Sequence, residues 1–261
     1  MTSPEGRRDQ LPRGRADIHI HTLASDGVSS VAQILHAAES MPELDVIAIT
    51  DHERIDAAQA AQAMARDRGL RVEVIVGEEI STRGGHLLAL FMEERVPPWR
   101  SLRSSIAHVH EQGGLAIIAH PLVPYPLCAT GRTIRRLLDD PDALFRPDAI
   151  EAFNPTTARM RWGRQVPAFV EELGAVGVGG SDAHQATDVG HAVTTFPGRT
   201  AEELRAAILS GATGWDGSAY SWRKQLGTFR GQLGKNAVAV RDTARHRLLR
   251  DGVGRDLGYP R

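Results

Sequence analysis

Residues 16–26 read ADIHIHTLASD, a short apolar stretch that runs into two histidines and, five residues later, an aspartate. Successive side chains of a β-strand point to opposite faces, so positions i and i+2 share a face. His19 and His21 therefore converge on one point, and two imidazoles on one face of a strand are typical of a metal site. Asp17 and Asp26 flank the pair with carboxylates.

Seven short apolar segments recur along the chain, each rich in Val, Ile, Leu and Ala, as strands buried on both faces are. They are residues 16–20, 45–50, 72–77, 86–92, 115–119, 148–153 and 175–180. Stretches with helical periodicity separate most of them, namely residues 28–40, 54–69, 99–113, 156–173 and 200–210. This alternation predicts a parallel α/β fold. The Gly84-Gly85 pair joins two strand segments without a helix, which predicts a local hairpin.

Histidines or carboxylates follow the carboxyl ends of several segments. Asp51-His52, Glu78-Glu79, His120 and Asp182-Ala183-His184 occupy these positions. Active sites of parallel barrels and open sheets are built at that end of the strands. The repetition predicts a metal centre assembled from several strands, although strand alternation places only one of Glu78 and Glu79 inside.

Composition narrows the class of protein. The chain has 261 residues, 41% hydrophobic and 24% charged, which excludes collagen-like, disordered and coiled-coil classes for its bulk. No apolar run approaches the roughly 18 residues that a membrane span needs. The single cysteine, Cys128, excludes an internal disulfide and a Cys-based zinc cluster, and it favours a cytoplasmic location. A net charge of −1 gives no overall attraction to nucleic acid.

Three regions are predicted from these patterns. Residues 1–15 are polar and are expected to form a flexible leader, and residues 16–213 are expected to form the catalytic barrel. Residues 214–261 carry ten basic and four acidic side chains, with apolar residues at helical spacing. We expect this basic extension to be helical and packed on the barrel, and the alternative is a surface for RNA or an anionic membrane.

The motifs, in their order along the chain, resemble those of the PHP (polymerase and histidinol phosphatase) family. The motifs are His19-Ile20-His21, Thr50-Asp51-His52, Gly77-Glu78-Glu79-Ile80-Ser81, Ala119-His120-Pro121 and Ser181-Asp182-Ala183-His184. The resemblance implies a distorted (βα)7 TIM-like barrel, in agreement with the seven apolar segments. It also selects Glu79 over Glu78, through the family pattern Gly-x-Glu.

The resemblance further implies two or three divalent metal ions, with manganese, iron or zinc suited to mixed imidazole and carboxylate ligands. One ion would be held by His19, His21, Glu79 and Asp182. Glu79 would bridge to a second ion on His86 and His120, and a third would take Asp26, His52 and His184.

Four other residues are candidates for catalytic or substrate-binding roles. Asp51, like Asp17, is expected to orient a ligand histidine, and transfer of a proton by Asp51 is the alternative. Glu151 and Asn154 follow the sixth segment and either cap a loop or face the substrate. Arg159 lies downstream and could bind a phosphate with two hydrogen bonds, or be an ordinary surface residue.

A centre of this kind indicates hydrolysis of phosphate esters by attack of metal-bound hydroxide. Small phosphomonoesters such as nucleotides are the expected substrates. The reason is that an aspartate at position 26 resembles the pattern of the family branch that acts on nucleotide phosphates and short oligoribonucleotides. One alternative is an exonuclease on short oligonucleotides, guided by the basic extension. A non-catalytic metal-binding module is an alternative of another class. The sequence indicates no oligomeric state.

Overall fold

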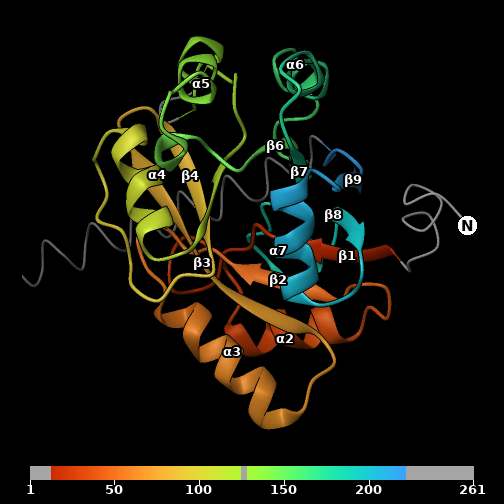
Figure 1. The fold of residues 1–261 in the computed structure, drawn as a ribbon. Helices are drawn as coiled ribbons and strands as arrows, with labels where there is room; N and C mark the ends of the chain where they lie inside the picture. The colour runs from red at the N-terminus through yellow and green to blue at the C-terminus, as the bar shows by residue number, and fades with distance from the viewer. Residues whose placement is uncertain (1–12, 125–127, 222–261) are drawn as a thin grey trace, which may run out of the picture. The chain divides into compact units, whose positions relative to one another are not determined.

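The computed structural model describes residues 13–124 and 128–221. Their strands form one nine-stranded sheet in the order β7-β6-β5-β4-β3-β2-β1-β8-β9 (Figure 1). The strands are β1 (Arg13–Asp17), β2 (Val46–Ile49), β3 (Glu73–Thr82), β4 (Gly85–Leu90), β5 (Leu115–Ile118), β6 (Ala149–Phe153), β7 (Gly177–Gly179), β8 (Ala192–Pro197) and β9 (Gly214–Gly217). All seven predicted segments overlap strands.

Six α-helices alternate with the strands in the described residues. They are α2 (Val31–Glu39), α3 (Asp56–Arg68), α4 (Leu102–Glu111), α5 (Gly131–Leu138), α6 (Val166–Glu172) and α7 (Ala201–Ser210). Capping boxes at Ser30 and Thr200 start α2 and α7, and Gly69 ends α3 in the left-handed conformation. The long helix expected over residues 156–173 is restricted to η2 (Gly163–Gln165) and α6, and α5 was not predicted.

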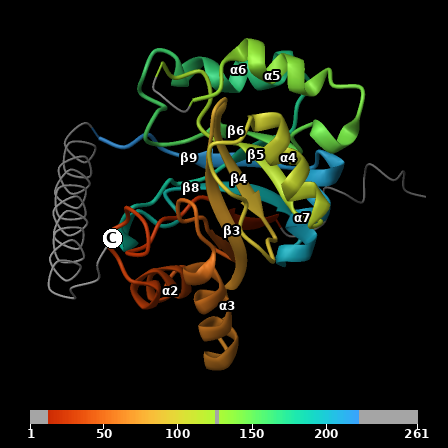
Figure 2. The ribbon, with the colours of Figure 1, turned by 90° about the vertical axis from the view of Figure 1, so that its left-hand side faces the viewer.

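Strand direction changes at two places. β1, β2 and β3 are parallel, as are β5, β6 and β7, whereas β4 runs antiparallel to both β3 and β5. Figure 2 shows β3 and β4 as a long hairpin beside α4, which confirms the hairpin predicted at Gly84-Gly85. β8 and β9 are additional antiparallel strands, so the count of seven does not describe the sheet.

The segments that follow β1 and β7 nearly close the sheet into a barrel. Ile20 and Ala183 form an isolated parallel bridge, in which the His21 amide donates to the Ala183 carbonyl at 2.8 Å. Asp17 supports the same junction, because its carboxylate accepts the backbone N–H groups of Ser181 and Gly190 at 3.0 and 2.7 Å. The expectation that Asp17 orients a histidine ring is wrong, since these bonds are to backbone amides.

Both faces of the strands are buried. On β2, Val46 and Ala48 pack inside the barrel, where Leu204 and Ile208 of α7 join them. Ile47 and Ile49 alternate with these two residues along β2. They pack in a separate apolar cluster with residues of α2 and α3. Because the interior is filled by apolar side chains, polar groups gather just beyond the strand ends.

In the structure, the barrel extends beyond both of the limits predicted from the sequence, residues 16 and 213. Residues 13–15 belong to β1 and pair with β8, so they are not part of a leader. β9 lies within the segment assigned to the basic extension, and the chain divides into units 1–220 and 221–261. Residues 1–12 and 222–261 lie outside the described residues, so the leader and the helical extension stay predictions there. No helix in the described part is long and apolar enough to cross a bilayer.

Gly177 on β7 makes room for the indole of Trp215 on β9, near the junction that closes the barrel. A Cβ at position 177 would overlap the six-membered ring of Trp215. We expect Gly177→Ala to lower the free energy of unfolding by about 1–3 kcal/mol, the usual cost of overpacking. Urea unfolding measures this, and Trp215→Leu in the same chain should recover part of the loss. Wild-type stability of Gly177→Ala would contradict this packing.

Candidate metal centre

All nine residues predicted as metal ligands come together at one end of the barrel, seven of them beyond strand ends and two within strands. His19, His21 and Asp26 follow β1, and His52 follows β2. Glu79 lies on β3, His86 on β4 and His120 just after β5, while Asp182 and His184 follow β7. Two of these residues, His120 and Asp182, have positive φ angles of 23° and 52°, a backbone strain that is common at functional sites.

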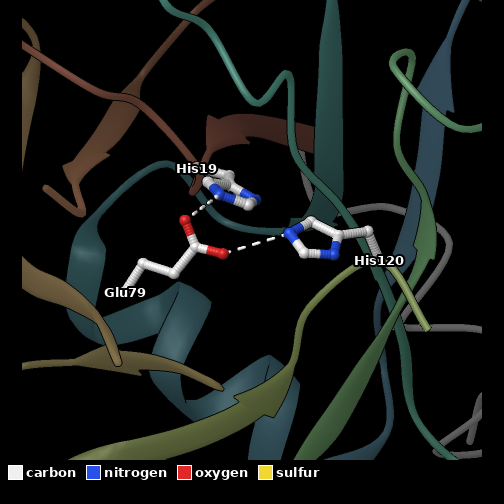
Figure 3. Close-up of side chains that lie close together, drawn as sticks. All are labelled: His19, Glu79 and His120. Atoms are coloured by element: carbon white, nitrogen blue, oxygen red, sulfur yellow. Dashed lines mark hydrogen bonds and ion pairs between the residues drawn. The ribbon is translucent and has the colours of Figure 1, made fainter. Parts of the chain in front are cut away.

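The carboxylate of Glu79 is at the centre of this group. Figure 3 shows its two oxygens pointing to different histidines, with Oε2 3.2 Å from His19 Nε2 and Oε1 3.0 Å from His120 Nε2. Oε1 also lies 2.8 Å from His86 Nδ1, and Oε2 lies 3.1 Å from His21 Nε2 and 3.5 Å from His52 Nε2. One buried carboxylate thus contacts five imidazoles.

These five imidazoles form a closed ring around Glu79. Centroid distances around it run 5.1 Å from His19 to His21, 4.8 Å to His52, 5.2 Å to His86, 5.3 Å to His120 and 5.7 Å back to His19. His19 and His21 are fully buried, whereas the His52 side chain is 27% exposed. The ring is therefore open to solvent on the His52 side.

Two more carboxylates and a sixth histidine extend the ring on the His21 side. Asp182 Oδ1 lies 3.4 Å from His21 Nε2 and 3.6 Å from His19 Nε2. Asp26 Oδ2 lies 2.9 Å from His184 Nε2, and Asp26 Oδ1 lies 3.5 Å from His21 Nδ1. His52 Nε2 is closer to Glu79 than to Asp26, which is 4.0 Å away, so His52 stands between two of the implied ligand groups.

Electrostatics keeps the carboxylates ionised. Burial alone would raise the pKa of Glu79, but the surrounding His52, His86 and His19 hold it well below its ordinary value. Asp182 behaves in the same way: burial opposes the charge, and the facing imidazoles hold its pKa well below the ordinary range. The negative charge that a cation requires is therefore present.

The histidines respond to the same charges in two ways. Burial lowers the pKa of His19 and His21, but the facing carboxylates outweigh burial and raise both pKa values well above the ordinary value. For His52 burial dominates and lowers the pKa to about 4. Protons on His19 and His21 must leave before their nitrogens can coordinate, so metal binding there releases protons.

The residues present fit divalent metal ions. Four triads have ligand atoms within 4.8 Å of one another: His19-Glu79-His120, His19-His21-Asp182, His21-Asp26-His184 and His21-His52-Glu79. Both ring nitrogens of His21 are buried beside carboxylates yet form no hydrogen bond with the described part of the chain. Ring nitrogens held close to carboxylates without hydrogen-bond geometry suit a cation between them better than a direct bond.

Glu151 has a role that the sequence did not reveal. Its Oε1 lies 2.8 Å from His19 Nδ1, and its Oε2 accepts the His120 backbone N–H at 2.6 Å. Asn154 Nδ2 donates to Glu151 Oε2 and to Asp182 Oδ2, at 3.1 and 3.3 Å. Both residues are buried. They hold the candidate ligands in place, and a substrate-facing role for either residue stays a prediction. The available signal was a carboxylate in the middle of an apolar strand.

Asp51 supports a loop. Its Oδ1 accepts the Thr22 backbone N–H at 2.7 Å and the Ser25 hydroxyl at 2.5 Å, and its Oδ2 accepts the Thr22 hydroxyl at 2.7 Å. These bonds fix the loop that carries Asp26. These bonds are to Thr22 and Ser25 and not to the ring of a ligand histidine, and transfer of a proton by Asp51 stays a prediction.

Glu78 and Arg159 lie apart from the centre. Glu78 is buried on the opposite side of β3 from Glu79, where its Oε2 accepts the Val96 N–H at 2.8 Å. The structure thus resolves the choice between the two glutamates. The side chain of Arg159 is exposed and forms no hydrogen bond or ion pair with the described part of the chain, so it stays a prediction as a phosphate ligand.

Comparison with known proteins places the chain in a family. A family model described as PHP-associated matches residues 161–213, which include Asp182 and His184. An uncharacterized protein of Methanocaldococcus jannaschii is 36% identical over 121 residues, covering 42% of this chain and 69% of that protein. The chain belongs to the PHP superfamily.

A solved structure shares the fold of this PHP chain. It is a two-domain protein from Bacteroides vulgatus containing a predicted PHP-like metal-dependent phosphoesterase, with a TM-score of 0.64 and 18% identity, covering 86% of this chain and 71% of that one. A 5′-3′ exoribonuclease of Haemophilus influenzae is 33% identical over 105 residues. That match covers 39% of this chain and 37% of the exoribonuclease, so it spans well under half of either protein. The predicted α/β barrel is confirmed.

Proposed function

We propose that this chain is a metal-dependent phosphoesterase that hydrolyses small phosphomonoesters such as nucleotides. The observation that carries the proposal is the ring of five imidazoles around Glu79, completed by Asp26, Asp182 and His184. Metal binding is the role that such a group of buried ionised carboxylates and imidazoles serves best. We expect two or three ions of manganese, iron or zinc, and we place the activity in the cytoplasm.

The bound ions, Glu79 and Glu151 would have different roles in the reaction. Divalent ions bound here would activate a water for attack and neutralise phosphoryl oxygens. The two oxygens of Glu79 face two halves of the centre, the His19 and His21 side and the His86 and His120 side. Glu151 accepts a hydrogen bond from His19 Nδ1–H, which keeps the proton on Nδ1 and leaves the lone pair of Nε2 directed toward the centre.

The exposed side of the ring suits substrate entry. The side chains of Asp26 and His52 are 26% and 27% exposed, whereas His19, His21 and Glu79 are buried. A phosphate group can approach from that side while its ester remainder stays in solvent. The buried His19 side of the ring stays closed, which fixes the direction of approach.

An exonuclease on short oligonucleotides is the second candidate. It is supported by the 33% identity to the exoribonuclease of Haemophilus influenzae. A non-catalytic module is disfavoured, because all nine candidate ligand positions are filled by residues able to coordinate a metal.

The test is phosphate release by the full chain loaded with Mn²⁺. The panel contains simple phosphomonoesters, nucleoside mono- and bisphosphates and a 5′-phosphorylated oligoribonucleotide. Phosphate from monoesters supports the first candidate, and stepwise release of nucleotides from the oligoribonucleotide supports the second. A metal-loaded protein that hydrolyses nothing on the panel would overturn both.

A further inference from the structure

A cavity of about 340 Å³ opens outside the metal centre. Its walls are residues 83–84 at the tip of the β3–β4 hairpin, residues 101–103 at the start of α4, and residues of α5 with Asp140 just beyond that helix. None of the nine candidate metal ligands is among the residues that line it. The volume lies at the lower end of the range of small-molecule sites. The cavity is therefore a candidate site for a small ligand that does not share the metal centre.

Arginines dominate the charges of this cavity. Arg83 comes from the hairpin, Arg103 from α4 and Arg136 from α5, whereas Asp140 is the one acidic residue among those lining the cavity. Asp140 accepts two hydrogen bonds from Arg103, at 2.7 and 3.3 Å, so these two charges compensate each other. The side chains of Arg83 and Arg136 are exposed and form no ion pair with the described part of the chain. Two positive charges therefore remain available to a ligand.

Arg103 adds a donor that is already fixed in position. Its Nε and Nη2 atoms are bonded to Asp140, and its guanidinium carbon lies 3.3 Å from the centroid of the Phe145 ring. The remaining nitrogen, Nη1, forms no hydrogen bond with the described part of the chain. Because the fork is held by the carboxylate and the ring, a ligand that accepts a bond from Nη1 would not have to order this side chain.

Apolar side chains and hydroxyl groups complete the lining. Leu102 and Leu137 belong to the apolar core and also line the cavity, so a ligand there would contact hydrophobic surface. Ser101 and Thr133, at the first turns of α4 and α5, bring hydroxyl groups to the same walls. A few polar groups on an otherwise apolar wall are typical of sites for small organic molecules. The lining thus suits a ligand with both an anionic and an organic part.

The unpaired guanidinium groups determine the charge of that ligand. A guanidinium binds a carboxylate or a phosphoryl group through two parallel N–H···O bonds, and such charge-assisted bonds are among the strongest in proteins. Two unpaired guanidinium groups match two negative charges, whereas a neutral or cationic ligand would leave both positive charges uncompensated. Phosphomonoesters and dicarboxylates are the common small organic molecules that carry two negative charges near neutral pH.

We propose that the cavity between the hairpin tip, α4 and α5 binds a small organic dianion. Arg83 and Arg136 bind its anionic groups, and its organic part packs against Leu102 and Leu137. The bound ligand links the tip of the β3–β4 hairpin to α5. This inference goes beyond the proposed function, because the site shares no residue with the metal centre and its ligand need not be hydrolysed.

The test is an NMR titration of the Zn²⁺-loaded full chain with isotope-labelled leucine methyl groups. The probes are phenylphosphonate and phthalate, which at mildly alkaline pH carry two negative charges on the same ring, one as a phosphonate and the other as two carboxylates. The signals of Leu102 and Leu137 should shift with at least one probe, and their dependence on concentration gives Kd at the cavity itself. The tighter probe shows whether the cavity prefers a phosphoryl group or two carboxylates. Benzoate, with one charge, should bind at least about tenfold more weakly.

Variants of the exposed arginines locate the binding groups. We expect the double variant Arg83→Ala/Arg136→Ala to raise this Kd at least about tenfold, because it removes both unpaired charges. Arg132→Ala is the matched control, because Arg132 is exposed on α5 but does not line the cavity, and its Kd should equal that of the wild type.

The titration requires no hydrolysis, so failure of the phosphoesterase proposal would leave its result unaffected. Leucine signals that do not shift with either dianion, or an unchanged Kd in the double variant, would overturn the inference. An equal loss of affinity in Arg132→Ala, or benzoate binding as tight as that of the dianions, would overturn it as well.

Discussion

Replacing Glu79 by glutamine is expected to remove bound divalent metal and to lower kcat for phosphoester hydrolysis by at least about 10³-fold, or roughly 4 kcal/mol of activation free energy. Glutamine conserves the volume but removes the charge that five imidazoles share. Metal content by mass spectrometry and phosphate release from the best substrate measure the two effects. Far-UV circular dichroism should be unchanged, because the strand and its packing are preserved.

Glu78→Gln provides the matched control for this experiment. The same change one residue away affects a carboxylate on the other side of β3, and the glutamine oxygen can still accept the Val96 N–H. Burial already raises the pKa of Glu78 to about 7, so the carboxyl is only partly ionised near neutral pH and the change removes less than a full charge. Full metal content and activity are expected. Equal losses in the two variants would contradict the central position of Glu79.

Glu151→Gln is expected to weaken metal affinity and activity by about 10- to 100-fold, the usual effect of removing a group that orients a ligand histidine. Glu151 accepts bonds from His19 on one oxygen and from the His120 amide and Asn154 on the other. A glutamine amide has one oxygen and one NH₂ group, so in either orientation a donor faces a donor. If the NH₂ group faces His19, Nδ1 must accept, which places the proton on Nε2 and prevents coordination.

A metal titration separates this positioning role from a general loss of stability. The activity of Glu151→Gln should be partly restored by excess Mn²⁺, because the ligands themselves remain. Glu171→Gln, an exposed site on α6, is the control and should match the wild type. Wild-type metal affinity in Glu151→Gln would show that Glu151 does not orient His19.

Most residues of the candidate centre are predictable from the sequence because they follow an apolar strand, whereas Glu79 and His86 lie within β3 and β4. The i, i+2 spacing of His19 and His21 and the position of Asp182 after β7 depend on local patterns only, and local patterns are visible in the chain. Placement at the carboxyl ends of the strands then follows from the parallel fold.

Other features depend on contacts between distant residues. The contact of Glu151 with His19 joins positions 132 residues apart, and no local pattern indicates it. β9 has the sequence Gly-Trp-Asp-Gly, which lacks the alternation of a buried strand, and it forms by pairing with β8. Asp51 resembles its neighbour His52 as a polar residue at a strand end, but its contacts with Thr22 and Ser25 give it a different role.

The most direct test of the account is the metal content of the purified full chain, measured together with phosphate release before and after treatment with a chelator. The account predicts two or three ions of manganese, iron or zinc per chain, loss of hydrolysis when they are removed and recovery when one of these metals is added back. A chain that retains no divalent metal, or that hydrolyses its substrates equally well after complete removal of metal, would contradict it.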